Sequence, residues 1–249
     1  MKKMIVWAFV AFFSLSSLSA CKVSVNSGSS FGKMKPSENI VAKEFQVQAF
    51  DAVDVSAVAH VKFVQGEADR YRVKISAPDN YIPLFKVESS KNELDIAFVR
   101  KNTNIEAKNV YVTIYAPTLR KIGNSGVAEV RIPELVTQTL TVENSGVGSM
   151  TIHRLKAQAV DVECSGVGNV ILDGTVEGAK LDCSGVGSIS AEKLNAKSVK
   201  ADVSGVGGIK CCALESIKGD VSGVGSLHYA GEPKHKELQR SGVGRISKL

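Results

Sequence analysis

The sequence predicts an all-β fold in which short strands stack as the rungs of a solenoid. Ser-Gly-Val-Gly recurs every 18 to 20 residues, and internal repetition at such a period is typical of solenoids. Each repeat is therefore expected to form one rung with the motif at its corner. The motif begins at Ser145, Ser165, Ser184, Ser204, Ser222 and Ser241, and a degenerate Ser-Gly-Val-Ala copy begins at Ser125.

Aligning the repeats on the serine places apolar residues in columns. The columns lie two, five and seven residues after the serine and three residues before it; the first runs from Val127 to Val243. Apolar columns repeated on every rung predict strands in register around a dry core. Glycine suits the corner because it accepts positive φ and leaves room for the next rung. Seven rungs would stack to about 30 Å at a strand spacing of roughly 4.8 Å.

Residues 40–122 form a less regular β portion ahead of these rungs. Runs such as FDAVDVSAVAHVKFVQG alternate apolar and polar residues, and turn signals such as Pro78-Asp79-Asn80 separate the runs. We therefore expect a single β-solenoid domain over residues 40–249, with the repeat rungs over residues 123–249.

The first 20 residues have the features of an export signal. Lys2 and Lys3 precede an apolar run over residues 4–13, which is too short to span a bilayer, and small residues follow. The sequence Leu-Ser-Ala-Cys ending at Cys21 resembles the bacterial lipobox, which implies cleavage before Cys21 and its lipidation. An ordinary secretory signal is the alternative.

Residues 21–39 then form a lipid anchor and a flexible tether rich in Ser, Gly and Lys. The membrane is thus a predicted partner, held through the N-terminal lipid. The outer membrane is favoured because Lys22, rather than the aspartate that retains enteric lipoproteins at the inner membrane, follows Cys21. The side of the membrane is left open.

The net charge and the spacing of histidines and cysteines exclude two classes of binding partner. The formal net charge of +6 falls to +4 without the signal, and no long basic run remains, so no nucleic acid partner is expected. The four histidines and five cysteines show no zinc-site spacing, so we predict neither metal nor cofactor.

The Gly-x-Gly spacing of the repeated motif also occurs in phosphate-binding loops. Such a loop must open a helix, whose free N–H groups bind the anion. Here period-two residues such as Met150-Thr151-Ile152 follow the motif, and the chain holds six identical copies. The motif is therefore interpreted as a corner of the fold.

An acidic column lies two residues before the serines. Neighbouring carboxylates would stand about 5 Å apart, close to the separation in retaining glycosidases. Lysines two residues earlier share the outward face and offset the repulsion. One interpretation is a solvated, charge-balanced ladder; the other is the active site of a carbohydrate-active enzyme. The ladder consists of Glu143, Glu163, Asp182, Asp202 and Asp220, beside Lys180, Lys200 and Lys218.

The cysteines leave a second question open. Cys164 and Cys183 share an inward column on adjacent rungs, where they form either buried thiols or a disulfide. Stacked positions have nearly parallel Cβ vectors, which suits disulfide geometry poorly. Cys211 and Cys212 are adjacent on one strand and are expected to face opposite sides, which makes Cys212 a candidate exposed thiol.

These motifs together resemble a known family. The opening F-x-x-V-x-V…V-x-F-x-Q-G, then APDN, NELDIAF, VYVTIYAPTLRKIGNSGV and the serial SGVG corners are similar to the "putative adhesin" family with the head GIN domain, over residues 40–249. The resemblance implies a right-handed β-helix-like solenoid and a cell-envelope location, and it carries no catalytic motif.

Three functions follow as hypotheses. The leading one is a non-enzymatic envelope lipoprotein, an adhesin or scaffold whose ladder surface binds a protein or glycan. The alternative is a polysaccharide lyase or hydrolase that uses the acidic ladder. The third is a self-assembling module, and so a homo-oligomer, although Arg245 and Lys248 near the C-terminus would discourage end-to-end stacking.

Overall fold

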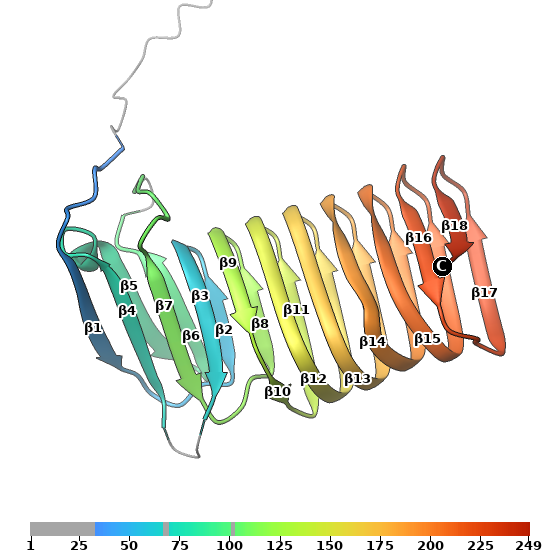
Figure 1. Ribbon diagram of the computed structural model, residues 1–249, viewed down its shortest axis with the longest axis horizontal. Coiled ribbons are helices and arrows are strands. Elements are labelled where there is room, and N and C mark those ends of the chain that lie inside the picture. Colours follow the sequence, from blue (N-terminus) through green and yellow to red (C-terminus); the bar gives the residue numbers. More distant parts are fainter. Residues whose placement is uncertain (1–32, 67–69, 101–102) are drawn as a thin grey trace, which may run out of the picture. The chain divides into compact units, whose positions relative to one another are not determined.

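The protein is described by a computed structural model over residues 33–66, 70–100 and 103–249, which form a β-solenoid (Figure 1). All 18 strands of the described residues belong to one continuous sheet that winds around a common interior. The described residues contain no α-helix and one short 3-10 helix, η1 (Ile82–Leu84). The predicted signal and Cys21 lie outside the described residues.

The repeats form the predicted rungs. Four long strands each bend around one rung, and they pair in parallel with the motif valines in register. They are β12 (Val147–Cys164), β13 (Val167–Cys183), β14 (Val186–Val203) and β15 (Val206–Val221). The rungs on either side are divided into β8 (Lys121–Asn124), β9 (Val127–Ile132), β10 (Leu135–Val136), β11 (Thr139–Asn144), β16 (Ser226–Ala230), β17 (His235–Arg240) and β18 (Arg245–Lys248).

The N-terminal portion does not stack in chain order. The rung of β2 (Ala52–Val55) and β3 (Val58–Gln65) lies between two later rungs, as Figure 1 shows. On one side it pairs in parallel with β6 (Glu93–Phe98) and β7 (Tyr111–Ala116), and on the other with β8 and β9. Nothing in the alternation of these strands indicated that order.

Antiparallel strands close the N-terminal end of the solenoid. β1 (Ile40–Gln46) pairs with β4 (Arg72–Pro78), β4 with β7, and β5 (Phe85–Ser90) with β6. Residues 33–39, expected to belong to the tether, are bound to this end: the Tyr81 hydroxyl donates to the Met34 carbonyl at 2.6 Å, and Ser37 bonds to Asp79. This part of the chain is therefore not a free linker.

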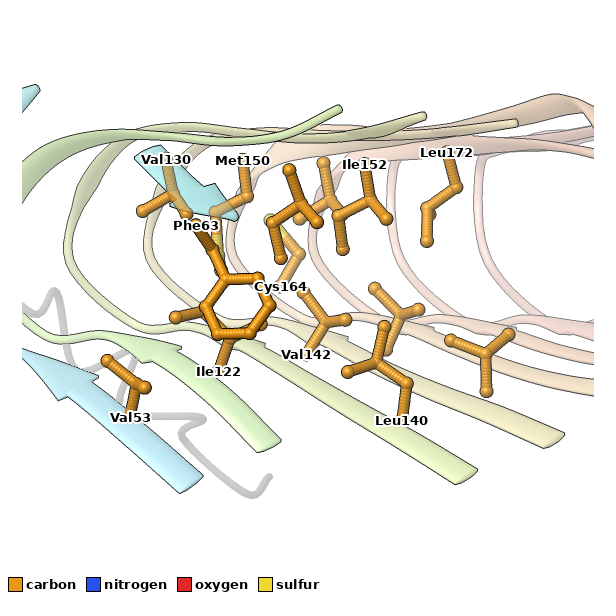
Figure 2. Close-up of a cluster of buried hydrophobic side chains, with 14 of the residues drawn as sticks. Val53, Phe63, Ile122, Val130, Leu140, Val142, Met150, Ile152, Cys164 and Leu172 are labelled. Carbon is orange, nitrogen blue, oxygen red and sulfur yellow. The ribbon is translucent and has the colours of Figure 1, made fainter. Parts of the chain in front are cut away.

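The core confirms most of the predicted columns. Side chains from facing walls meet in one interior, with Val130, Met150 and Ile152 opposite Ile122 and Val142, and Phe63 between them (Figure 2). All of them are buried because positions five and seven after the serine, and three before it, face inward.

The column two residues after the serine was wrongly assigned to the core. Its valines are 48% to 86% exposed. In five of the seven rungs the strand starts at this valine. The next inward positions are three, five and seven residues after the serine, so position two is out of phase with the core. The exposed column consists of Val127, Val147, Val167, Val186, Val206, Val224 and Val243.

The corner glycines allow the rungs to approach each other. A Cβ on Gly168 or Gly187 would overlap the carbonyl oxygen of the glycine in the preceding rung. Only Gly148 among the motif glycines has positive φ, at 133°. Close backbone contact, rather than left-handed conformation, is therefore the main reason for glycine at the corner.

In the C-terminal rung, cationic side chains occupy inward positions that hold apolar residues in the rung before it. Lys236, Arg240 and Lys248 continue the inward columns that hold Ile217, Val221 and Tyr229 one rung earlier. The Arg240 guanidinium donates to the Gly244 carbonyl, and the Lys248 ammonium pairs with Glu232. Charges at inward positions of an edge strand oppose pairing with another chain.

Candidate functional site: a charged face and its groove

The acidic residues of the predicted ladder lie on the face that ends at the Ser-Gly corner. Glu143, Glu163, Asp182, Asp202 and Asp220 occupy one register position on successive strands. Lys121 pairs with Glu143 at 2.8 Å, and Lys200 pairs with Asp202 at 3.4 Å. The ladder is thus partly neutralised by lysines of the same face.

The acidic register position continues into the N-terminal portion. Gly123 follows Glu143 in register, then Asp54 and Asp95. The Asp54 carboxylate covers Gly123, where an added Cβ would lie 2.8 Å from its Oδ1, and accepts a hydrogen bond from Ser125 at 3.1 Å. Burial raises the pKa of Asp54, and nearby Asp95 adds to the effect.

The lysines form a second column beside the ladder. Lys180, Lys200 and Lys218 stack in register on three consecutive rungs, with Asp161 before them and Glu237 after them. Lys180 pairs with Asp161 at 3.0 Å and Lys218 with Glu237 at 2.6 Å. Hydrogen bonds to these carboxylates raise the pKa of both lysines.

A shallow groove of about 990 Å³ lies along this lysine column. Its lining runs from β11 to β17 and holds five lysines against two carboxylates. A column of mostly small residues lies two positions before the lysines: Thr139, Ala159, Gly178, Ser198, Ser216 and His235. None of the five ladder carboxylates lines the groove.

Sequence reasoning missed this groove. It depends on the bend of each rung, which alternation does not reveal. The available signal was the column of small residues two positions before the lysines, which becomes visible only when the repeats are aligned in register.

Cys164 and Cys183 stack in register, and both are buried, free thiols. Each thiol donates to the carbonyl of the motif glycine four residues on, Gly168 or Gly187, at 3.5 Å. The hydrogen-bonding neighbour Cys183, and then burial, raise the pKa of the Cys164 thiol. Buried thiols and a disulfide are the two alternatives that the sequence left open, and intact mass with and without alkylation would distinguish them.

Cys212 is not the exposed thiol that the sequence suggested. It is 8% exposed, and Cys211 and Ala213 on either side are also buried. The rung of β15 is shorter than that of β14, and the register shifts between Ala191 and Asn195, so alternation breaks at this corner. Burial raises the pKa of Cys211 to about 12, which makes it a poor nucleophile.

The repeated corner offers no phosphate-binding loop. The backbone N–H groups of Ser145 and Gly146 both donate to the carbonyl of Asn124 on the preceding rung, at 3.0 and 2.9 Å. The same pattern recurs at Ser165 and Ser184. Strand follows every corner, so the N–H groups that would bind an anion are used within the fold.

Within the described ranges, no group of three or more His, Cys, Asp or Glu side chains could hold a metal ion. No helix in the part of the chain that the structure describes is long and apolar enough to cross a membrane.

The comparisons with known proteins agree with this architecture. Residues 49–233 match the family model described as "Putative auto-transporter adhesin, head GIN domain". The chain belongs to this family. No relative was found among the curated proteins. The description of the family indicates a protein of the cell envelope or surface.

Solved structures include a similar member. A "putative adhesin" from Bacteroides fragilis NCTC 9343 is 36% identical, with a TM-score of 0.84 over 87% of this chain and 100% of that one. Two proteins from Parabacteroides distasonis ATCC 8503 share the fold: a "putative lipid binding protein" at 16% identity and a "putative adhesin" at 20%. Their TM-scores are 0.70 and 0.64, and each match covers 88% of this chain and 100% of theirs.

Proposed function

We propose that this family member is a non-enzymatic lipoprotein of the cell envelope, which binds a surface component through its solenoid. Cys21 would carry the lipid in the outer membrane, and the rungs would present the charged face to a protein or glycan. The observation that carries the proposal is the groove beside the lysine column, which extends over several rungs of a rigid stack. The adhesin description of the family supports the same function.

The anchor and the adhesion are tested together in cells. Cys21→Ser should release the protein from the membrane fraction and shift its gel mobility, because two or more acyl chains are needed for stable anchoring. Cells that display the wild-type chain should adhere to a surface component captured by cross-linking, and cells with Cys21→Ser should not. Unchanged membrane association or unchanged mobility of the variant would contradict the anchor.

A carbohydrate-active enzyme is the second candidate. It is favoured by the in-register stacking of Glu163 and Asp182, because adjacent strands hold such carboxylates about 5 Å apart. Incubation of the purified chain with acidic polysaccharides should show no shortening of the polymer if the first proposal holds. Cleavage that Asp182→Asn abolishes would establish the enzyme instead.

A further inference from the structure

The charge of the groove indicates the chemistry of its ligand. Lys180, Lys200, Lys218, Lys234 and Lys236 line it, against Asp161 and Glu237. Lys234 and Lys236 have no ion-pair partner among the described residues. A concave surface with an excess of one charge raises the local concentration of ligands of the opposite charge.

The lysines repeat along the solenoid rather than cluster at one point. Lys180, Lys200 and Lys218 hold the same register position on three neighbouring rungs. Parallel strands place such positions about 4.8 Å apart, so the Cα atoms of the three lysines rise along the solenoid axis at that interval. This interval is close to the length that one sugar ring adds to an extended glycan. A polymer with one carboxylate on each ring would meet one lysine on each rung.

The groove also suits a sugar chain in its other residues. Gly178 leaves room for close approach, while Ser198 and Ser216 offer hydroxyl groups beside the lysines. No Phe, Tyr or Trp lines the groove, so stacking on aromatic rings would not hold a neutral sugar there. Charge and hydrogen bonding are the interactions that this lining provides.

The existing ion pairs do not prevent binding. The side chains of Lys180, Lys200 and Lys218 are 51% to 58% exposed, and their carboxylate partners lie at the surface. Exposed pairs of this kind are worth about 1 kcal/mol or less. A ligand that offers several carboxylates at once can replace such partners.

We propose that the groove binds an acidic polysaccharide, extended along the solenoid axis, with its carboxylates on Lys180, Lys200 and Lys218. The inference deepens the proposed function, on which it rests, by naming an acidic glycan as the ligand class. Each carboxylate would form a charge-assisted hydrogen bond with one lysine, and the serine hydroxyls would bind the sugar.

Titration calorimetry of the full chain in detergent tests the proposal. The probe is a galacturonic acid oligomer long enough to cover the groove, and its carboxyl-reduced form is the neutral control. The wild-type chain should bind the acidic oligomer, and raised salt should weaken this binding because exposed charges are screened. The reduced oligomer should not bind. Equal affinity for both oligomers would overturn the proposal.

A matched pair of variants locates the binding. Lys200→Gln combined with Lys218→Gln should lower the affinity for the acidic oligomer by about tenfold, equivalent to roughly 1.4 kcal/mol. Lys62→Gln with Lys210→Gln removes the same charge outside the groove and should change affinity by less than about twofold. Equal weakening by both pairs would overturn the proposal. Binding of single-stranded DNA of equal charge with equal affinity would also overturn it, because the groove would then recognise charge alone.

Cell adherence separates this inference from the proposed function. Cells that adhere through the wild-type chain while the chain fails to bind the acidic oligomer would overturn the ligand class alone. A chain that binds the oligomer through Lys200 and Lys218 but stays off the membrane would support the groove and contradict the anchored adhesin.

Discussion

The two portions of the solenoid reach a closed core by different means. Residues 40–122 join strands that are far apart in the chain, such as Val53 with Ile122, and fill their interior with Phe50, Phe63 and Tyr81. Residues 123–249 pair each rung with its neighbour in the sequence, and they fill the core mainly with aliphatic residues and cysteine, besides the hydrogen-bonded Asn124 and Asn144 and, near the end, Tyr229. The repeats therefore extend the fold rung by rung, whereas the N-terminal portion sets its first rungs and covers one end of the core.

The largest expected effect concerns the cationic residues of the C-terminal rung. Changing Lys236, Arg240 and Lys248 to valine should make the chain self-associate, because an apolar edge strand pairs with other chains. Light scattering over a concentration series should show a rise in mass above that of the wild-type chain. Lys62, Lys74 and Lys210 changed to valine make a control with the same loss of charge elsewhere. Similar association of the control would show that the cations at the end have no special role.

The next effect compares one core residue from each portion. Phe63→Ala should lower the free energy of unfolding by about 4 kcal/mol, because it empties a fully buried site between the walls. Ile152→Val in the repeats removes one methylene and should cost about 1 kcal/mol. Denaturant unfolding measures both values. A smaller loss of unfolding free energy for Phe63→Ala than for Ile152→Val would contradict the role of Phe63 in filling the N-terminal core.

Glycine gives a similar contrast. Gly187→Ala should lower the free energy of unfolding by about 3 kcal/mol, because its Cβ would overlap the Gly168 carbonyl and force the rungs apart. Gly66 has open space around the position of a Cβ, so Gly66→Ala should change stability by less than about 0.5 kcal/mol. Thermal unfolding distinguishes the two. Equal stability of both variants would mean that the rungs separate without cost.

The smallest effect concerns a contact between the portions. Gln65 donates to the Val136 and Pro117 carbonyls and accepts from the Val136 N–H, each at 2.9 Å. Gln65→Ala should lower the free energy of unfolding by about 1 kcal/mol, because hydrogen bonds at a mostly solvent-accessible site are exchanged for bonds to water. Gln138→Ala, an exposed control for which no side-chain bond occurs in the structure, should have no measurable effect. An unchanged unfolding midpoint for Gln65→Ala would show that the portions are joined by strand pairing alone.

Periodicity predicts the parts of the fold that repeat locally. The rung length, the corner, the core columns at Val130 and Ile152 and the register of the acidic ladder all follow from aligning the copies. The repeat alignment alone predicts Val127 as inward, which is wrong because this position is out of phase with the core. Cys212 was misplaced because the shortened rung of β15 interrupts alternation.

The sequence pattern does not predict which distant strands pair or where the surface is concave. Strands β2 and β3 alternate like any other strands, and nothing in their residues indicates that β6–β7 and β8–β9 flank them. The groove arises from how each rung bends, and alternation does not reveal that bend. From the sequence alone, the lysine column is therefore interpreted only as balancing the charge of the acidic ladder. The site residues were thus visible in the sequence, but the concave surface beside them was not.

The interleaved rung has a consequence for the order of folding. During synthesis from the N-terminus, β2 and β3 have no partner on either side until residues 93–132 follow. The first half of the chain must therefore assemble as one cooperative unit, at the slow rate that non-local pairing imposes. Each later repeat finds a finished template beside it and can add as soon as it emerges. We therefore expect the N-terminal portion to fold slowly and the later repeats to add quickly.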